Sequence, residues 1–148
     1  MEKISSLIFG LSLFMIPILL KKEKKKKILI IGDVHGCLDE FKEIIEKAEK
    51  EEGTIDEIYQ VGDLVNKGPK SLEVLDFVIE KKIKCILGNH DELAINSYEN
   101  KIDFQLDWVS KMNEKQYKYL KCLPLYRKIP EYNLLLVHAG KKKKKKKI

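Results

Sequence analysis

The 148-residue chain is predicted to form an α/β domain built on a parallel sheet. Three apolar runs rich in Ile and Val alternate with two amphipathic segments, in the order strand, helix, strand, helix, strand. This alternation is typical of parallel sheets with right-handed crossovers. A βαβαβ start is expected, followed by a helical insert and then by a pair of antiparallel strands.

The first half of the chain contains two of these strands and one helix. Residues 27–31 are a continuous apolar run after one Lys, which predicts a buried strand. Asp39–Glu51 has apolar residues at helical spacing with charges between them, which predicts an amphipathic helix that ends at Gly53. Ile55–Val61 is predicted to be the second strand.

The elements that follow complete the pattern. Apolar residues at helical spacing mark a second helix: Leu72, Leu75, Val78 and Ile79. Ile83–Leu87 is predicted to be the third strand, and residues 91–123 change to helical spacing, with Trp108 expected to cap the core. Leu125–Ile129 and Tyr132–Val137 are then expected to pair antiparallel.

Charge is unevenly distributed along the chain. The net charge is +6, yet residues 28–140 contain 15 Lys and Arg against 21 Asp and Glu, a balance of −6. The excess positive charge lies in two lysine-rich tracts, 21–27 and 141–147. We therefore expect three segments: a hydrophobic anchor or signal with a Lys-rich linker over 1–27, an acidic domain over 28–140, and a poly-Lys tail over 141–148. An acidic domain argues against a basic nucleic-acid-binding face.

Residues 4–20 are uncharged, and their 17 residues are at the short limit for crossing a bilayer. Lys21 follows directly, without a small-residue cleavage pattern, which favours an uncleaved membrane anchor with the domain in the cytosol. A cleaved signal peptide leading to the secretory pathway and a mis-called first exon are the alternatives.

Four short motifs follow the ends of predicted strands: GDVHG at 32–36, GDLVNKGP at 62–69, GNHD at 88–91 and VHAG at 137–140. In parallel sheets, ligands bind outside the carboxyl ends of the strands. Asp, Asn and His are hard oxygen and imidazole ligands, and together they can hold two divalent metals bridged by a shared carboxylate.

Each motif offers residues with a chemical role. Asp33 and His35 are two apart on what we expect to be extended chain, so both would point toward one cation. Asp63 could bridge to a second cation, and Asn89 offers a neutral oxygen ligand. His90 could donate a proton to a leaving oxygen, because the reference pKa of His lies near physiological pH.

The last predicted strand delivers His138 to the same edge. Taken singly, the motifs have simpler explanations, such as a surface Asp-Gly turn or a buried, satisfied histidine. Their joint occurrence in this order favours a dinuclear metal site.

The series GDVHG, GDLVNKGP, GNHD and VHAG resembles the calcineurin-like phosphoesterase superfamily of the PPP type. Within it, the similarity is greatest to the symmetrical bis(5′-nucleosyl)-tetraphosphatase (diadenosine-tetraphosphatase-like) branch, and it runs from about Ile28 to Gly140. Protein Ser/Thr phosphatases of the superfamily have GDxVDRG and GNHE. Asn66 and Asp91 depart from that pattern and favour the nucleotide-type branch.

The resemblance implies a ligand set for two divalent metals. One metal would be held by Asp33, His35 and Asp63. The other would be held by the bridging Asp63 with Asn89 and His138. Mn²⁺ is the expected metal, with Fe or Zn²⁺ as alternatives, since mixed nitrogen and oxygen ligands do not select among them.

The resemblance also implies further roles around the metals. His90 would protonate the leaving group. Lys67 stands where the family uses an Arg to grip the phosphate, and Lys offers a point charge without the bidentate fork. Asn66 stands where protein phosphatases have the acid that orients the catalytic histidine.

Beyond Gly140 the family continues for roughly another half-domain, which supplies a further His ligand, a phosphate-binding Arg and the second sheet of a β-sandwich. The chain is therefore expected to be a C-terminally truncated member, with a partial α/β-β sandwich. The predicted function is hydrolysis of a phosphoric ester or anhydride, with dinucleoside polyphosphates or related nucleotides as substrates, by attack of a metal-bound hydroxide. The alternatives are an inactive remnant that attaches to anionic surfaces through its lysine tracts, and a protein Ser/Thr phosphatase.

Overall fold

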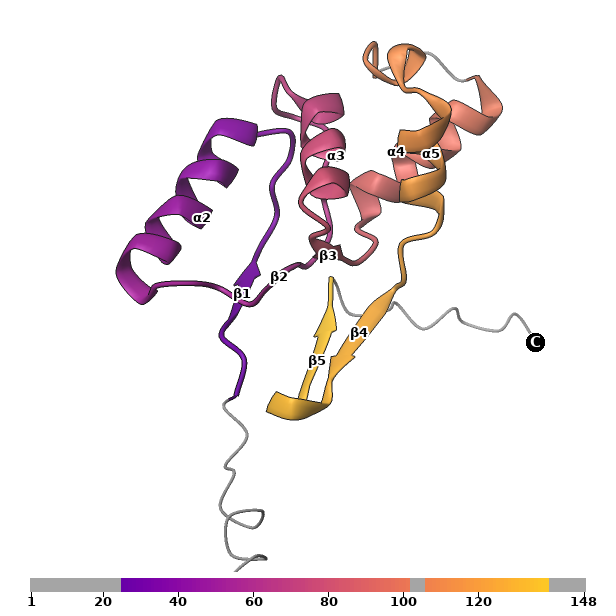
Figure 1. Cartoon of the computed structure of the whole chain (residues 1–148). Coiled ribbons are helices and arrows are strands. Elements are labelled where there is room, and N and C mark those ends of the chain that lie inside the picture. The colour runs from indigo at the N-terminus through magenta and orange to yellow at the C-terminus, as the bar shows by residue number, and fades with distance from the viewer. Residues whose placement is uncertain (1–24, 102–105, 139–148) are drawn as a thin grey trace, which may run out of the picture.

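The computed structural model describes residues 25–101 and 106–138, which form a mixed α/β fold (Figure 1). Its centre is a parallel sheet of β1 (Ile28–Ile31), β2 (Glu57–Gln60) and β3 (Lys84–Cys85), in that spatial order. Ile28 pairs with Glu57, and Tyr59 pairs with Lys84. The predicted α/β class and its parallel βαβαβ start are confirmed.

Two helices connect these strands and cover one face of the sheet. Helix α2 (Leu38–Glu52) buries Leu38, Phe41 and Ile45, which share one face of the helix. Its C-terminal cap is Gly53 at φ +78°, a left-handed conformation that glycine adopts without steric cost. Helix α3 (Ser71–Glu80) contributes fully buried Val and Leu side chains to the same apolar cluster.

The helical insert consists of α4 (Asn89–Asn100), the 3₁₀ turn η1 (Val109–Lys111) and α5 (Glu114–Lys121). Asn113 caps α5, because its side chain accepts the backbone N–H of Gln116. Helix α4 begins two residues earlier than the predicted helical region, so the third motif forms its first turn.

The antiparallel pair is also as predicted. Strands β4 (Tyr126–Ile129) and β5 (Leu134–Val137) are joined by the 3₁₀ turn η2 (Pro130–Tyr132), and Figure 1 shows them beside the parallel sheet. Their buried residues Ile129 and Leu136 pack with Tyr59 and Ile86 in a second apolar cluster.

Adjacent residues of β2 show that the two clusters lie on opposite faces of the sheet. Ile58 packs against the helical cluster, whereas Tyr59 belongs to the cluster of the β pair. Successive side chains of a strand point to opposite faces. The helices, the parallel sheet and the β pair therefore lie in successive layers.

The predicted membrane anchoring is corrected. Within residues 25–101 and 106–138, no helix has the length and apolar character needed to cross a bilayer. The segment that suggested an anchor, residues 4–20, lies outside the described residues, and its 17 residues fall short of the roughly 20 that a spanning helix uses. The tails at 1–27 and 141–148 also lie almost entirely outside the described part of the chain, so the domain boundaries stay predictions.

Candidate metal centre

The loop after β1 presents Asp33 and His35 through a turn. His35 has a φ of +49°, so the expectation of extended chain between these two residues is wrong. The backbone N–H groups of Val34 and His35 both donate to the carbonyl oxygen of Asp63, at 3.0 and 2.9 Å. These bonds join the first two motif loops, and the turn leaves His35 Nε2 3.6 Å from Asp33 Oδ2.

The loop after β2 is braced by a buried carboxylate. Both oxygens of Asp91 accept backbone N–H groups: those of Asp63 and Gly88 at 2.9 Å on Oδ2, and those of Leu64 and Val65 at 2.9 and 3.3 Å on Oδ1. Burial raises the pKa of Asp91, and the hydrogen bonds from Gly88 and Leu64 oppose that rise. Asp91 therefore ties this loop to the start of α4.

Asp63 lies at the centre of the cluster. It is buried, and its Oδ1 accepts the backbone N–H of His90 at 2.8 Å. The same oxygen is 3.3 Å from His138 Nε2, and Oδ2 is 3.7 Å from His35 Nε2. One carboxylate thus reaches both of the histidines that were predicted to be ligands.

His138 shows why this cluster suits a cation. Its Nδ1 is 2.8 Å from the carbonyl oxygen of Val61, so in the neutral ring Nδ1 carries the hydrogen and donates it. The ring then presents the lone pair of Nε2 toward Asn89 Oδ1 at 3.0 Å and Asp63 Oδ1 at 3.3 Å. Three acceptor atoms converge there, and a cation bound between them would satisfy all three.

His35 repeats this arrangement. Its Nδ1 is 3.3 Å from the carbonyl oxygen of Val65, so Nε2 again faces the two carboxylates. Metal-ligating histidines commonly donate their other ring nitrogen in this way. Lys67 Nζ donates to His35 Nε2 at 2.9 Å, so an ammonium group already stands where a metal cation would accept the lone pair. The donor set therefore fits divalent metals.

His90 lies beside these ligands. Single donor atoms of His35, Asp63 and His90 all fall within 4.8 Å of one another, and the rings of His35 and His90 meet edge to face with centroids 4.9 Å apart. The structure thus brings together all the residues predicted for the site: Asp33, His35, Asp63, Lys67, Asn89, His90 and His138. Their individual roles stay predictions.

Glycines and left-handed residues make this close approach possible. A Cβ on Gly62 would lie 2.8 Å from both the Gly88 backbone and His138 Nδ1, so the second and third motif loops meet only because that side chain is absent. Four residues of the site have positive φ without being glycine: His35, Asp63, Asn66 and Lys67. Such conformations cluster at functional sites.

Two residues of the site escaped the sequence analysis. Asp91 was noted only as a departure from the protein phosphatases, yet it accepts four backbone N–H groups. Trp108 packs against the core as expected, and its indole N–H, for which no role was predicted, also donates to the side chain of Asn66 at 3.0 Å. These residues are 42 positions apart, and no local pattern links them.

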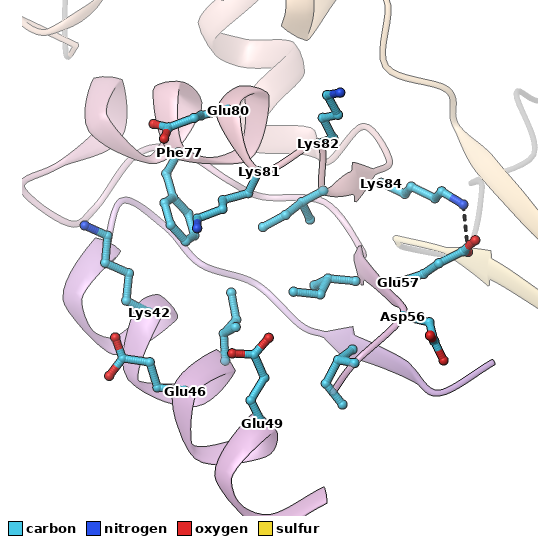
Figure 2. Close-up of a pocket in the computed structure, with 14 residues that line it drawn as sticks. Lys42, Glu46, Glu49, Asp56, Glu57, Phe77, Glu80, Lys81, Lys82 and Lys84 are labelled. Carbon is cyan, nitrogen blue, oxygen red and sulfur yellow. Dashed lines mark hydrogen bonds and ion pairs between the residues drawn. The ribbon is translucent and has the colours of Figure 1, made fainter. Parts of the chain in front are cut away.

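A cavity of about 870 Å³ lies elsewhere, between α2, α3 and the amino ends of β2 and β3 (Figure 2). Five acidic residues and four lysines share its walls: Glu46, Glu49, Asp56, Glu57, Glu80, Lys42, Lys81, Lys82 and Lys84. Mixed charges of this kind do not select one class of ligand. A smaller cavity of about 540 Å³ adjoins the metal cluster, because Asn89 and His138 line both.

Known proteins match this chain in sequence and structure. The profile of the family described as "Calcineurin-like phosphoesterase" matches residues 26–147. A symmetrical bis(5′-nucleosyl)-tetraphosphatase from Psychromonas ingrahamii is 40% identical over 120 residues, which is 75% of this chain and 43% of that protein. The enzyme of the same name from Buchnera aphidicola is 36% identical over 74% of this chain and 42% of its own length. The chain thus spans less than half the length of these relatives.

Solved structures agree with these relatives. A crystal structure of a protein provisionally named a diadenosine tetraphosphatase superposes with a TM-score of 0.70 at 28% identity, over 80% of this chain and 52% of that one. A metallophosphoesterase from Sphaerobacter thermophilus superposes with a TM-score of 0.54, also at 28% identity, over 70% of this chain and 44% of that one.

Proposed function

Because this chain belongs to the calcineurin-like phosphoesterase family, we propose that its site hydrolyses phosphoric esters or anhydrides, with dinucleoside polyphosphates as the substrate class. The names of the matching tetraphosphatases support that class. The observation that carries the proposal is the convergence of three lone-pair atoms: Asn89 Oδ1 and Asp63 Oδ1 lie 3.0 and 3.3 Å from His138 Nε2.

Two divalent cations, preferably Mn²⁺, would occupy this cluster. Asp33 and His35 would serve one cation, Asn89 and His138 the other, and Asp63 both. When bound, such cations supply Lewis acidity, which activates water as a nucleophile and offsets the charge of the phosphoryl group. The described residues alone provide little positive charge for this purpose, since Lys67 is the one lysine in contact with the cluster among them.

Lys67 and His90 would act on the substrate. The ammonium group of Lys67 lies against His35, at the exposed side of the cluster, where it would attract a phosphoryl oxygen. His90 would supply the hydrogen that the leaving oxygen needs as its bond to phosphorus breaks. Its backbone N–H donates to Asp63, so the main chain at His90 is fixed relative to the proposed ligands.

The test is hydrolysis by the full chain with added Mn²⁺, using diadenosine tetraphosphate, p-nitrophenyl phosphate and a phosphopeptide. We expect turnover of the first two that falls by at least about 10³-fold in the Asp63→Asn variant, because the shared carboxylate is lost. Turnover that equals the Asp63→Asn control would contradict the proposal and favour the inactive remnant. Preference for the phosphopeptide would instead favour a protein phosphatase.

A further inference from the structure

We propose that Trp108 is a positioning residue for His90, and that it acts through Asn66 to place the hydrogen of the neutral His90 ring on Nε2. The inference deepens the proposed function and rests on it in one respect: His90 serves the leaving oxygen. Its geometric part rests only on contacts among residues 66, 90 and 108.

Two independent contacts fix the orientation of the Asn66 amide. The indole N–H of Trp108 is a donor only, so the Asn66 atom 3.0 Å from it must be the oxygen. The backbone carbonyl of His90 is an acceptor only, so the Asn66 atom 3.1 Å from it must be the nitrogen. The oxygen and nitrogen of an amide look alike in most structures, but these two partners leave one choice.

This orientation determines the tautomer of His90. The Asn66 amide nitrogen carries two hydrogens, of which one is directed to the carbonyl oxygen of His90. The same nitrogen is 3.4 Å from His90 Nδ1, and the second hydrogen is available to it. Nδ1 therefore accepts a hydrogen bond, and the neutral ring carries its own hydrogen on Nε2.

Asn66 and Trp108 are both held firmly enough for this role. Asn66 is buried, its backbone N–H donates to Ser71 Oγ at 3.0 Å, and its φ of +71° is one that Asn tolerates better than most residues. Trp108 packs against the main apolar cluster, and Val109 after it is buried. The rotation of the amide is the remaining freedom, and the indole N–H sets it together with the His90 carbonyl, so loss of the indole donor weakens the constraint.

An Asp at position 66 would reverse the arrangement. A carboxylate accepts hydrogen bonds and cannot donate them. His90 would then carry its hydrogen on Nδ1 and leave Nε2 without one. Asn66→Asp keeps the size and the left-handed tolerance of the side chain but loses the hydrogen bond to the His90 carbonyl, so its result is read together with that of Trp108→Phe, which leaves Asn66 in place.

The direct test is NMR of the full chain with ¹⁵N-labelled histidine, in the presence of a chelator and at about pH 8. The chain has three histidines, and a His90→Gln sample assigns the signals of His90. We expect hydrogen on Nε2 in the unaltered chain, on Nδ1 in Asn66→Asp, and a mixture of tautomers in Trp108→Phe. Hydrogen on Nδ1 in the unaltered chain, or no change in Trp108→Phe, would overturn the proposal.

Tyr117→Phe is the matched control. It removes one aromatic donor from the same helical layer, the hydroxyl that donates to Glu99 Oε1 at 2.6 Å, without touching Asn66. This variant must retain the tautomer of the unaltered chain. A change of tautomer in Tyr117→Phe would show that general loosening of the insert, and not the indole N–H, governs His90.

Leaving-group dependence gives a second measurement. Phenyl phosphate releases a more basic oxygen than p-nitrophenyl phosphate and depends more on a hydrogen donor. We expect Trp108→Phe to lower kcat about 10-fold on phenyl phosphate and less than about 2-fold on p-nitrophenyl phosphate, with KM unchanged. Equal losses on both substrates would refute the positioning role. If no substrate turns over, the proposed function fails, and the NMR result alone decides the tautomer.

Discussion

The two ends of the parallel sheet treat their charges differently. At the amino ends, the Glu57 carboxylate pairs with Lys26 at 2.8 Å and Lys84 at 2.7 Å, and accepts the hydroxyl of Tyr59 at 2.6 Å. Figure 2 shows the pair of Glu57 with Lys84. At the carboxyl ends, Asp33 and Asp63 converge with imidazoles whose lone pairs face them. Glu57 is thus paired within the chain, whereas Asp63 lies 3.3 and 3.7 Å from imidazole nitrogens.

Burial makes this difference costly. The side chain of Asp63 is 5% exposed, compared with 19% for Glu57. A buried charge without full compensation destabilises a fold, so the carboxyl end gives up stability that the amino end retains. The contrast supports a site organised for a ligand, because Glu57 has three partners within the chain, whereas Asp63 faces two imidazole nitrogens.

The largest expected effect is stabilisation by metal. Mn²⁺ at about 1,000 times its dissociation constant should stabilise the full chain by about 4 kcal/mol, because it binds the folded state in preference to the unfolded one. For a domain of this size the melting temperature should rise by about 10 °C or more. Scanning calorimetry with and without Mn²⁺ measures the shift.

The two ends provide the variant and its control. Asp63→Asn should abolish the metal-dependent shift, whereas Glu57→Gln should retain it in full. A shift of equal size in both variants would place the metal outside the candidate centre and remove the contrast between the two ends.

The next effect concerns the brace between the second and third motif loops. Asp91→Asn replaces one acceptor oxygen with an NH₂ group that faces backbone N–H donors, so the folded state should lose about 2–3 kcal/mol. Urea unfolding measures the loss as a lower midpoint. Asp39→Asn is the control, because that carboxylate is exposed and pairs only with Lys70 among its contacts in the described residues. Equal midpoints for Asp91→Asn and the unaltered chain would show that the brace is unnecessary.

The smallest effect concerns Glu57, at the amino ends of the parallel strands. Hydrogen bonds from Lys26, Lys84 and Tyr59 lower the pKa of Glu57 from 4.5 to about 2. The unfolded chain takes up this proton first, so the stability from Glu57 is present above about pH 4.5 and is lost as pH falls toward 2. The unaltered chain should melt about 2–4 °C above Glu57→Gln at pH 7, with the gap narrowing below pH 4.5. A gap that widens on acidification would contradict this assignment.

The sequence predicted the layers of the fold because they depend on local periodicity. Apolar runs located β1 and β2. The helices α2 and α3 between the strands then predicted that the strands run parallel. The helix of the third motif was placed late, because Asn89 and His90 are weak helix formers. They are helical here because the Asp91 side chain accepts the backbone N–H of Gly88 and so caps the N-terminus of α4.

The residues of the candidate site could be predicted from the sequence, but the way they are arranged in space could not. The motifs predicted which residues would meet because Asp, Asn and His repeatedly follow strand ends. The turn at His35 was missed because it depends on bonds to the carbonyl of Asp63, 28 residues away. The hydrogen bond of Trp108 was missed for the same reason, since its partner Asn66 lies in the second motif loop, 42 residues away.

The positive φ values of the site have a consequence for protein engineering. His35 and Lys67 occupy backbone conformations that cost most L-residues about 1–2 kcal/mol and glycine almost nothing. Selection for heat resistance alone would therefore favour glycine at both positions, and would remove an imidazole and an ammonium group together. Any stabilised version of this scaffold should be screened for function at these two codons first.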